Sequence, residues 1–62
     1  MLLNAVDDED RLCLVNSDQI FYLLPAEDKG SDMFKAMIKD KPAVRFYISK
    51  MELKRWDMGA FI

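Results

Sequence analysis

The chain has 62 residues, of which 52% are hydrophobic, and a net charge of −2. This length fits one domain, spanning residues 1–62, that buries only about 60% of the surface of its unfolded chain. A single cysteine, Cys13, and no histidine exclude an internal disulfide and a Cys/His zinc site. Stability must then come from packing alone or from association with a partner.

Targeting signals are not evident in the sequence. No stretch approaches the roughly 20 apolar residues of a membrane span. The apolar start of the chain, residues 1–6, is short and runs directly into acidic residues, unlike a signal peptide. Together with the unpaired cysteine, this predicts a cytoplasmic protein without membrane contact.

Clusters of turn-forming residues recur at short intervals and predict short antiparallel strands between them. The clusters are residues 7–10, 16–18, 25–31 and 40–42, and the strands are expected at residues 2–6, 11–15, 19–24 and 43–49. The third of these strands contains a continuous apolar run from Ile20 to Leu24, which predicts burial on both faces.

Residues 33–39 fit two structures. Phe34, Ala36 and Ile38 alternate with other residues as in a strand. However, Ser31 and Asp32 are good helix caps, and the segment is rich in the strong helix formers Met, Ala and Lys. We favour a strand because the neighbouring segments follow a strand pattern, and a short helix remains the alternative.

The segment after the last strand begins with the capping-box pattern. The Ser49 hydroxyl is expected to accept a hydrogen bond from the Glu52 amide, and the Glu52 carboxylate to reach back. This predicts a short helix over residues 50–58, with Gly59 as its stop.

The predicted fold class is small α+β and mostly β. It consists of an antiparallel meander of four to five strands with a short C-terminal helix on one face. Leu53 and Trp56 are three residues apart and share one side of this helix, where Trp56 is expected to anchor it to the sheet.

Charge is distributed unevenly along the chain. Residues 1–28 hold one basic and seven acidic residues, whereas residues 29–56 hold eight basic and three acidic ones. Three interpretations remain open: the halves pair within one fold, two copies pair crosswise, or the basic half binds an anion.

The residues of common catalytic sites are scarce. Histidine, the usual acid–base group near neutral pH, is absent, and the glycines Gly30 and Gly59 form no phosphate-binding loop. Cys13 lies in an apolar strand and is interpreted as an inert core thiol. The acidic run 7–10 lacks the alternating ligands and central glycine of a calcium loop, and is interpreted as a solvated hairpin tip. We therefore expect no enzyme activity, no cofactor and no metal.

The apolar surplus predicts a small regulatory or adaptor protein of phage or bacterial type that acts by protein–protein binding and forms a homodimer. Large aromatic and flexible methionine side chains dominate such contacts. The predicted contact residues are Phe21, Tyr47, Trp56, Met58 and Phe61.

A nucleic-acid-binding transcription regulator is the alternative function. Basic residues alternate with aromatic ones in the C-terminal half, as phosphate contacts and base stacking require, although a pI near 4.8 is far below that of typical nucleic-acid-binding domains. The predicted contacts are Lys39, Lys41, Arg45, Lys50, Lys54 and Arg55.

Four segments of the chain carry a resemblance to a known family: Asp18-Gln19-Ile20-Phe21-Tyr22-Leu23, Ile38-Lys39-Asp40-Lys41, Arg45-Phe46-Tyr47-Ile48-Ser49 and Met51-Glu52-Leu53. Together they resemble the β-core of the LytTR-type DNA-binding domains of bacterial regulators. In that family an aspartate opens an Ile/Tyr-rich strand, a Lys-Asp-Gly hairpin follows, and a Ser-capped helix comes after a basic strand. The resemblance covers about residues 2–56 and implies a related β-meander. Lys41, followed by Pro42, stands in place of the hairpin glycine, and the later DNA-contacting strands of the family have no counterpart, so no functional residue is carried over.

Overall fold

The computed structural model describes residues 1–56, which fold into a five-stranded antiparallel sheet and one short α-helix. The predicted fold class is confirmed. Two single-turn 3₁₀ segments, η1 (Ser17–Gln19) and η2 (Glu27–Lys29), connect the strands on either side of β3. The strands and helix are β1 (Leu2–Val6), β2 (Leu12–Asn16), β3 (Ile20–Pro25), β4 (Met33–Ile38), β5 (Lys41–Ser49) and α1 (Lys50–Arg55).

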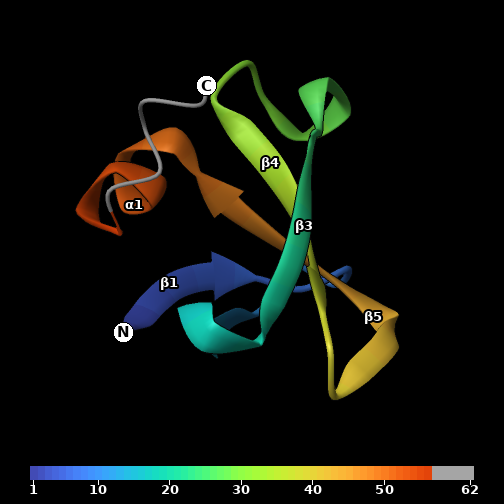
Figure 1. The fold of residues 1–62 in the computed structure, drawn as a ribbon. Helices are drawn as coiled ribbons and strands as arrows, with labels where there is room; N and C mark the ends of the chain where they lie inside the picture. Colours follow the sequence, from blue (N-terminus) through green and yellow to red (C-terminus); the bar gives the residue numbers. More distant parts are fainter. Residues whose placement is uncertain (57–62) are drawn as a thin grey trace.

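The strand order in the sheet is β2-β1-β5-β4-β3. Strands β3, β4 and β5 form a three-stranded meander, and the β1–β2 hairpin joins it through pairing of β1 with β5. The first and last described strands, β1 and β5, are therefore neighbours inside the sheet, and β2 and β3 are its edges within the described residues. Figure 1 shows the course of the chain through the sheet and into α1.

Segment 33–39 is a strand, as favoured, because β4 lies between β3 and β5. Its backbone groups pair on both sides, with Ala36 opposite Leu23 in one neighbour and Phe46 in the other. A helix there would leave both neighbouring strands without these hydrogen-bond partners. The helical alternative is wrong.

The connection η1 carries the chain from one edge of the sheet to the other. The Asn16 side chain accepts a hydrogen bond from the Asp18 amide at 3.0 Å, and the Gln19 carbonyl accepts one from the Lys39 amide at 2.8 Å. The first bond caps η1, and the second ties η1 to the β4–β5 turn.

The hydrophobic core lies on one face of the sheet, which we call the core face. Leu3, Ile48 and Leu53 are fully buried there, and α1 covers this face through Leu53. The alternation of buried and exposed residues along β1 follows from the two-residue period of a strand. The opposite face, which we call the outer face, has no α-helix over it within residues 1–56.

Strand β3 is not buried on both faces, so that prediction is wrong. The side chains of Phe21, Tyr22 and Leu24 are 50%, 43% and 42% exposed. An uninterrupted apolar run is typical of a central strand, but β3 is at an edge, and only its core-facing residues reach the core.

Half of the predicted capping box forms. The Ser49 hydroxyl accepts a hydrogen bond from the Glu52 amide at 3.3 Å. The Glu52 carboxylate does not reach back; it accepts from the Asn4 amide at 2.8 Å and from Arg55 at 2.7 Å. Because β1 and β5 are in register at a single pair, Val6 and Tyr47, the Asn4 amide is left for this carboxylate.

The helix is shorter than predicted. It ends at Arg55, with Trp56 as its C-cap residue, and Met58 and Gly59 lie outside the described residues. Among residues 1–56, the structure has no helix with the length and apolar character needed to cross a membrane.

Replacement of Leu53 by alanine should destabilise the fold by about 2–5 kcal/mol, because the change leaves a cavity under α1. Met51→Ala on the same helix is the matched control, since Met51 is 76% exposed and its loss should change stability by less than about 0.5 kcal/mol. Urea unfolding followed by circular dichroism measures both. Equal effects of the two substitutions would contradict the placement of α1.

The Glu52 carboxylate should make stability depend on pH. Backbone hydrogen bonding from Asn4 is the main cause that lowers the pKa of Glu52, and Arg55 adds to it. Because the folded-state pKa is lowered, the stabilisation is complete above the unfolded pKa and is lost as pH falls through the folded value. The difference in melting temperature between wild type and Glu52→Gln should therefore shrink below about pH 5.

Glu27→Gln is the control for this measurement, because Glu27 is exposed and no side-chain hydrogen bond is found for it among residues 1–56. This variant removes one carboxylate without removing a hydrogen bond of the described residues, so its melting temperature near neutral pH should stay close to that of wild type. A constant difference between wild type and Glu52→Gln across the acid range would show that the charge of Glu52 does not contribute.

Candidate protein-binding surface

Large apolar side chains remain exposed in two groups on the sheet. One group lies on the β1–β2 hairpin and the other on β3, whereas the exposed Met51 lies apart from both on α1. Exposed apolar patches of this kind are typical of sites where a partner binds. The hairpin group is Met1, Leu2, Leu12 and Leu14; the β3 group is Phe21, Tyr22 and Leu24.

The leucines of the hairpin group share the outer face. Leu12 and Leu14 are 88% and 61% exposed, and they stand opposite Val6 and Asn4 of β1. Directly opposed residues of an antiparallel pair point to the same face. The intervening residue Cys13 points to the core face, opposite Ala5. We call Leu12 and Leu14 the edge leucines.

The backbone of β2 is open on the side away from β1. The Ser17 amide donates to the Met1 carbonyl at 2.8 Å, and the Asp7 amide donates to the Arg11 carbonyl at 3.1 Å. Hydrogen-bonded pairs alternate along an antiparallel ladder, so these bonds direct the N–H and C=O groups of the edge leucines and of Asn16 away from β1. No other described strand pairs with them.

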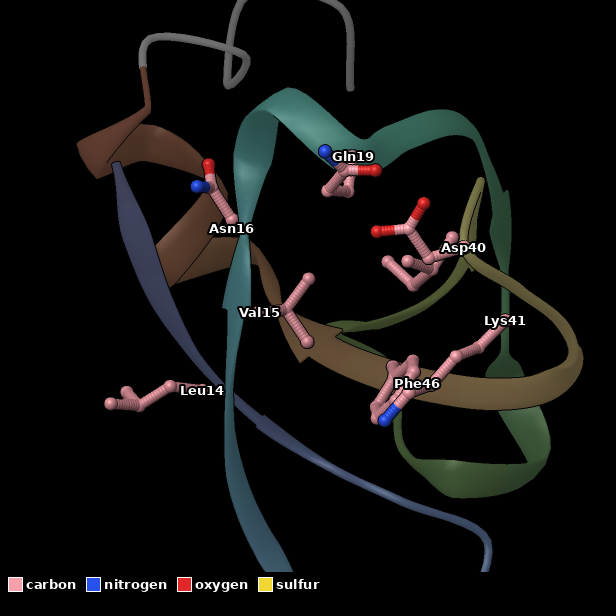
Figure 2. A pocket seen from close by; sticks show the side chains of 8 residues that line it. Leu14, Val15, Asn16, Gln19, Asp40, Lys41 and Phe46 are labelled. Atoms are coloured by element: carbon pink, nitrogen blue, oxygen red, sulfur yellow. The ribbon is translucent and has the colours of Figure 1, made fainter.

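A cleft of about 150 Å³ opens beside β2 on the core side. Figure 2 shows Val15 and Phe46 pointing into the cleft, whereas Leu14 points away from it. A strand placed along β2 would therefore have the edge leucines on one side and the mouth of this cleft on the other. The remaining lining residues are Asn16, Gln19, Ile38, Asp40 and Lys41.

The other edge of the sheet is protected against pairing. β3 has a bulge between Ile20 and Tyr22 and ends at Pro25. Bulges and prolines are devices by which natural sheets prevent a further strand from adding to an edge. β2 pairs with β1 in unbroken register and contains no proline and no charged residue. The two edges therefore differ in their ability to accept a strand.

The acidic run 7–10 is a turn that Asp7 organises. The Asp7 carboxylate accepts hydrogen bonds from the amides of Glu9 and Arg11, at 2.9 and 3.0 Å, and from the Arg11 side chain at 2.9 Å. The backbone hydrogen bond from Arg11 is the main cause that lowers the pKa of Asp7. Within residues 1–56 no group of acidic, histidine or cysteine side chains is placed to hold a metal ion.

The predicted contact residues do not form one surface. Phe21 is exposed on β3, and Trp56 is half-buried against the core, where it was expected to anchor α1. Tyr47 is buried, with 6% of its surface exposed, so it is not part of the exposed apolar surface. Met58 and Phe61 lie outside the described residues.

Two loops cover Tyr47 on the outer face. The Lys29 ammonium lies 4.9 Å from the centre of the Tyr47 ring, and the Tyr47 hydroxyl donates a hydrogen bond to Asp8 at 3.3 Å. Lys29 also lies 4.0 Å from a carboxylate oxygen of Asp10. These contacts join residues far apart in the sequence, so the strand pattern around Tyr47 gave no indication of its burial.

The six predicted nucleic-acid contacts are dispersed. Lys39 and Lys41 lie at the β4–β5 turn, whereas Lys50, Lys54 and Arg55 lie on α1 at the opposite end of β5. The nine residues of β5 span roughly 25–30 Å, which separates the two groups. The sixth residue, Arg45, stands opposite Met37 and points to the outer face.

Cys13 packs against the core, as predicted. It is half-buried on the core face of β2, and burial raises the pKa of its thiol. The thiolate is therefore disfavoured, which makes this cysteine a slow nucleophile.

The edge leucines were missed because segment 11–15 was interpreted only as apolar. The sequence does contain a signal for them. Alternate residues of a strand point to opposite faces, and in this segment both faces are apolar: Leu12 and Leu14 lie on one, Cys13 and Val15 on the other. A chain this short can bury only one of the two sets under its own residues.

Comparisons of the chain with protein-family models, with curated proteins and with solved structures find no match. The resemblance to LytTR-type domains therefore remains a prediction. The function has to be argued from the surface itself.

Proposed function

We propose that this chain is a small, non-enzymatic regulatory or adaptor protein that acts by protein–protein binding and binds a second copy of itself. The observation that carries the proposal is the pair of edge leucines, 88% and 61% exposed on an unprotected strand edge. We further propose a cytoplasmic setting of phage or bacterial type, in line with the absence of disulfides.

Burial of these leucines supplies the driving force for association. Removing a leucine side chain from water contributes about 1.5–3 kcal/mol, and a symmetric dimer would bury the pair from each copy. The same strand edge offers backbone hydrogen bonds, which fix the orientation of the partner. Apolar contact combined with strand addition favours a protein partner.

The ionisable groups with lowered pKa support a binding role over catalysis. The lowered pKa values of Asp7 and Glu52 are explained by hydrogen bonds that hold the acidic turn and attach α1 to β1. These carboxylates already have structural partners. A catalytic acid or base needs instead a group poised to exchange protons near neutral pH.

Nucleic-acid binding is the second candidate, favoured by one row of residues on the outer face. Tyr22, Met37 and Arg45 stand opposite one another across β3, β4 and β5. Tyr22 is 43% exposed, and Arg45 has no acidic partner among residues 1–56. An aromatic ring beside a cation suits stacking of a base with contact to its phosphate.

Light scattering on a sizing column, at low and high salt, tests self-association. We expect wild type to form a dimer at both salt concentrations, because apolar contacts are little screened by ions. The double variant Leu12→Lys/Leu14→Lys should be monomeric, with a dimer dissociation constant raised by at least about a hundredfold. Met51→Lys places the same charge on an exposed apolar site of α1 and should leave the dimer intact.

A monomeric wild type at both salts would refute self-association. Loss of the dimer in Met51→Lys, with the circular dichroism spectrum preserved, would place the contact on α1 instead of β2. Titration with a labelled single-stranded oligonucleotide tests the second candidate, which requires binding that weakens steeply as salt rises.

A further inference from the structure

We propose that two copies pair antiparallel along β2, about a two-fold axis that passes between their Cys13 residues, so that the two five-stranded sheets join into one. This inference rests on the proposed self-association and specifies its geometry. In this arrangement Leu12 of each copy stands opposite the partner's Leu14, and Cys13 stands opposite the partner's Cys13.

The choice of edge follows from the difference between β2 and β3. β2 is uninterrupted from Leu12 to Asn16, and its free backbone groups belong to residues whose side chains are exposed. β3 is interrupted by its bulge and ends in Pro25. Strand addition requires a run of regularly spaced free N–H and C=O groups, and only the β2 edge provides one without interruption.

The antiparallel direction follows from charge. The acidic turn of residues 7–10 directly precedes β2. Parallel pairing would place the two acidic turns side by side, where like charges repel. Antiparallel pairing separates them and brings each turn to the end of the partner's β2 at which Lys41 lines the cleft, with Asp40 and Asp18 also at that end.

The register follows from the positions of the free backbone groups. They belong to Leu12, Leu14 and Asn16, so only these residues can form hydrogen-bonded pairs across the new contact. Five symmetric registers satisfy this condition: Leu12 opposite Leu12, Leu12 opposite Leu14, Leu14 opposite Leu14, Leu14 opposite Asn16, and Asn16 opposite Asn16. Only the register with Leu12 opposite Leu14 gives each edge leucine an opposing leucine, and it buries the most apolar surface on the outer face.

In this register the second copy also covers the cleft beside β2. The core-facing side chains next to the axis are Cys13 and Val15, and Val15 already points into the cleft beside Phe46 (Figure 2). A partner strand along β2 covers the open mouth of this cleft from the side. Both faces of the new contact are then apolar near the axis, as in the interior of a single sheet.

Formation of a disulfide between the two Cys13 residues tests the register directly. In the proposed register the two Cys13 residues form a non-hydrogen-bonded pair, with Cα atoms about 4.5 Å apart, within the range for a disulfide. In the register that pairs Leu14 with Leu14 they are diagonal neighbours, about 7–8 Å apart, which is too far. An added oxidant that accepts the two electrons, while two protons leave, should convert wild type to a reducible species of twice the 7.2 kDa chain mass.

Two controls measure disulfide formation by random encounters between chains. Leu14→Cys in a Cys13→Ser background removes an edge leucine, so it is oxidised at a protein concentration at which light scattering still shows a dimer. This dimer should not be trapped, because the two positions 14 are diagonal in the proposed register. Wild type in urea gives the background rate for unfolded chains. Trapping of the Leu14→Cys variant, but not of wild type, would overturn the proposed register.

Amide hydrogen exchange of wild type tests the edge without any substitution. The amides of Leu12 and Leu14 donate to the partner in the proposed dimer, so their exchange should slow as the protein concentration rises through the dimerisation range. A dimer by mass whose Leu12 and Leu14 amides exchange at a concentration-independent rate would overturn the β2 contact and leave the proposed self-association standing. A monomer by mass would refute both.

Discussion

The constraint on which this structure depends is that residues 1–56 cover one face of the sheet far more completely than the other. Within the described residues, α1 has six residues and reaches the core through Leu53, and it lies on the core face alone. On the outer face, Tyr47 is shielded from solvent by Lys29 and is buried. The apolar side chains of β2 and β3 that point outward have no such cover.

Pairing of β1 with β5 decides where this uncovered surface lies. The contact is a short ladder with Val6 opposite Tyr47, extended by the hydrogen bond from the Asn4 amide to the Glu52 carboxylate. The first and last described strands, β1 and β5, pair inside the sheet. Strands β2 and β3, which lie between them in the sequence, are therefore left for the two edges. Each of these edges brings an apolar outer face to the rim.

Local patterns in the sequence predicted the strands and the helix well, but they did not predict which strands lie side by side in the sheet. The alternation of apolar with other residues predicted β4 and β5, and the capping pattern at Ser49 predicted the start of α1. Each of these patterns depends only on residues close together in the chain. The Glu52 carboxylate instead binds an amide 48 residues away, which a capping pattern cannot indicate. The burial of Tyr47 and the exposure of β3 depend in the same way on strand order, and short apolar runs do not encode strand order.

The uneven distribution of charge is not neutralised inside the described fold. Among residues 1–56, the contact between Lys29 and Asp10 joins the two halves at 4.0 Å, whereas the other ion pairs are local to the acidic turn or to α1. The acidic turn therefore remains a charged tip at one end of an uncharged, leucine-bearing strand. Such a strand attracts an apolar partner along its length and disfavours any arrangement that brings two tips together. In the dimer that we propose, the charge asymmetry would set the orientation of the second copy, while the apolar edge would provide the attraction.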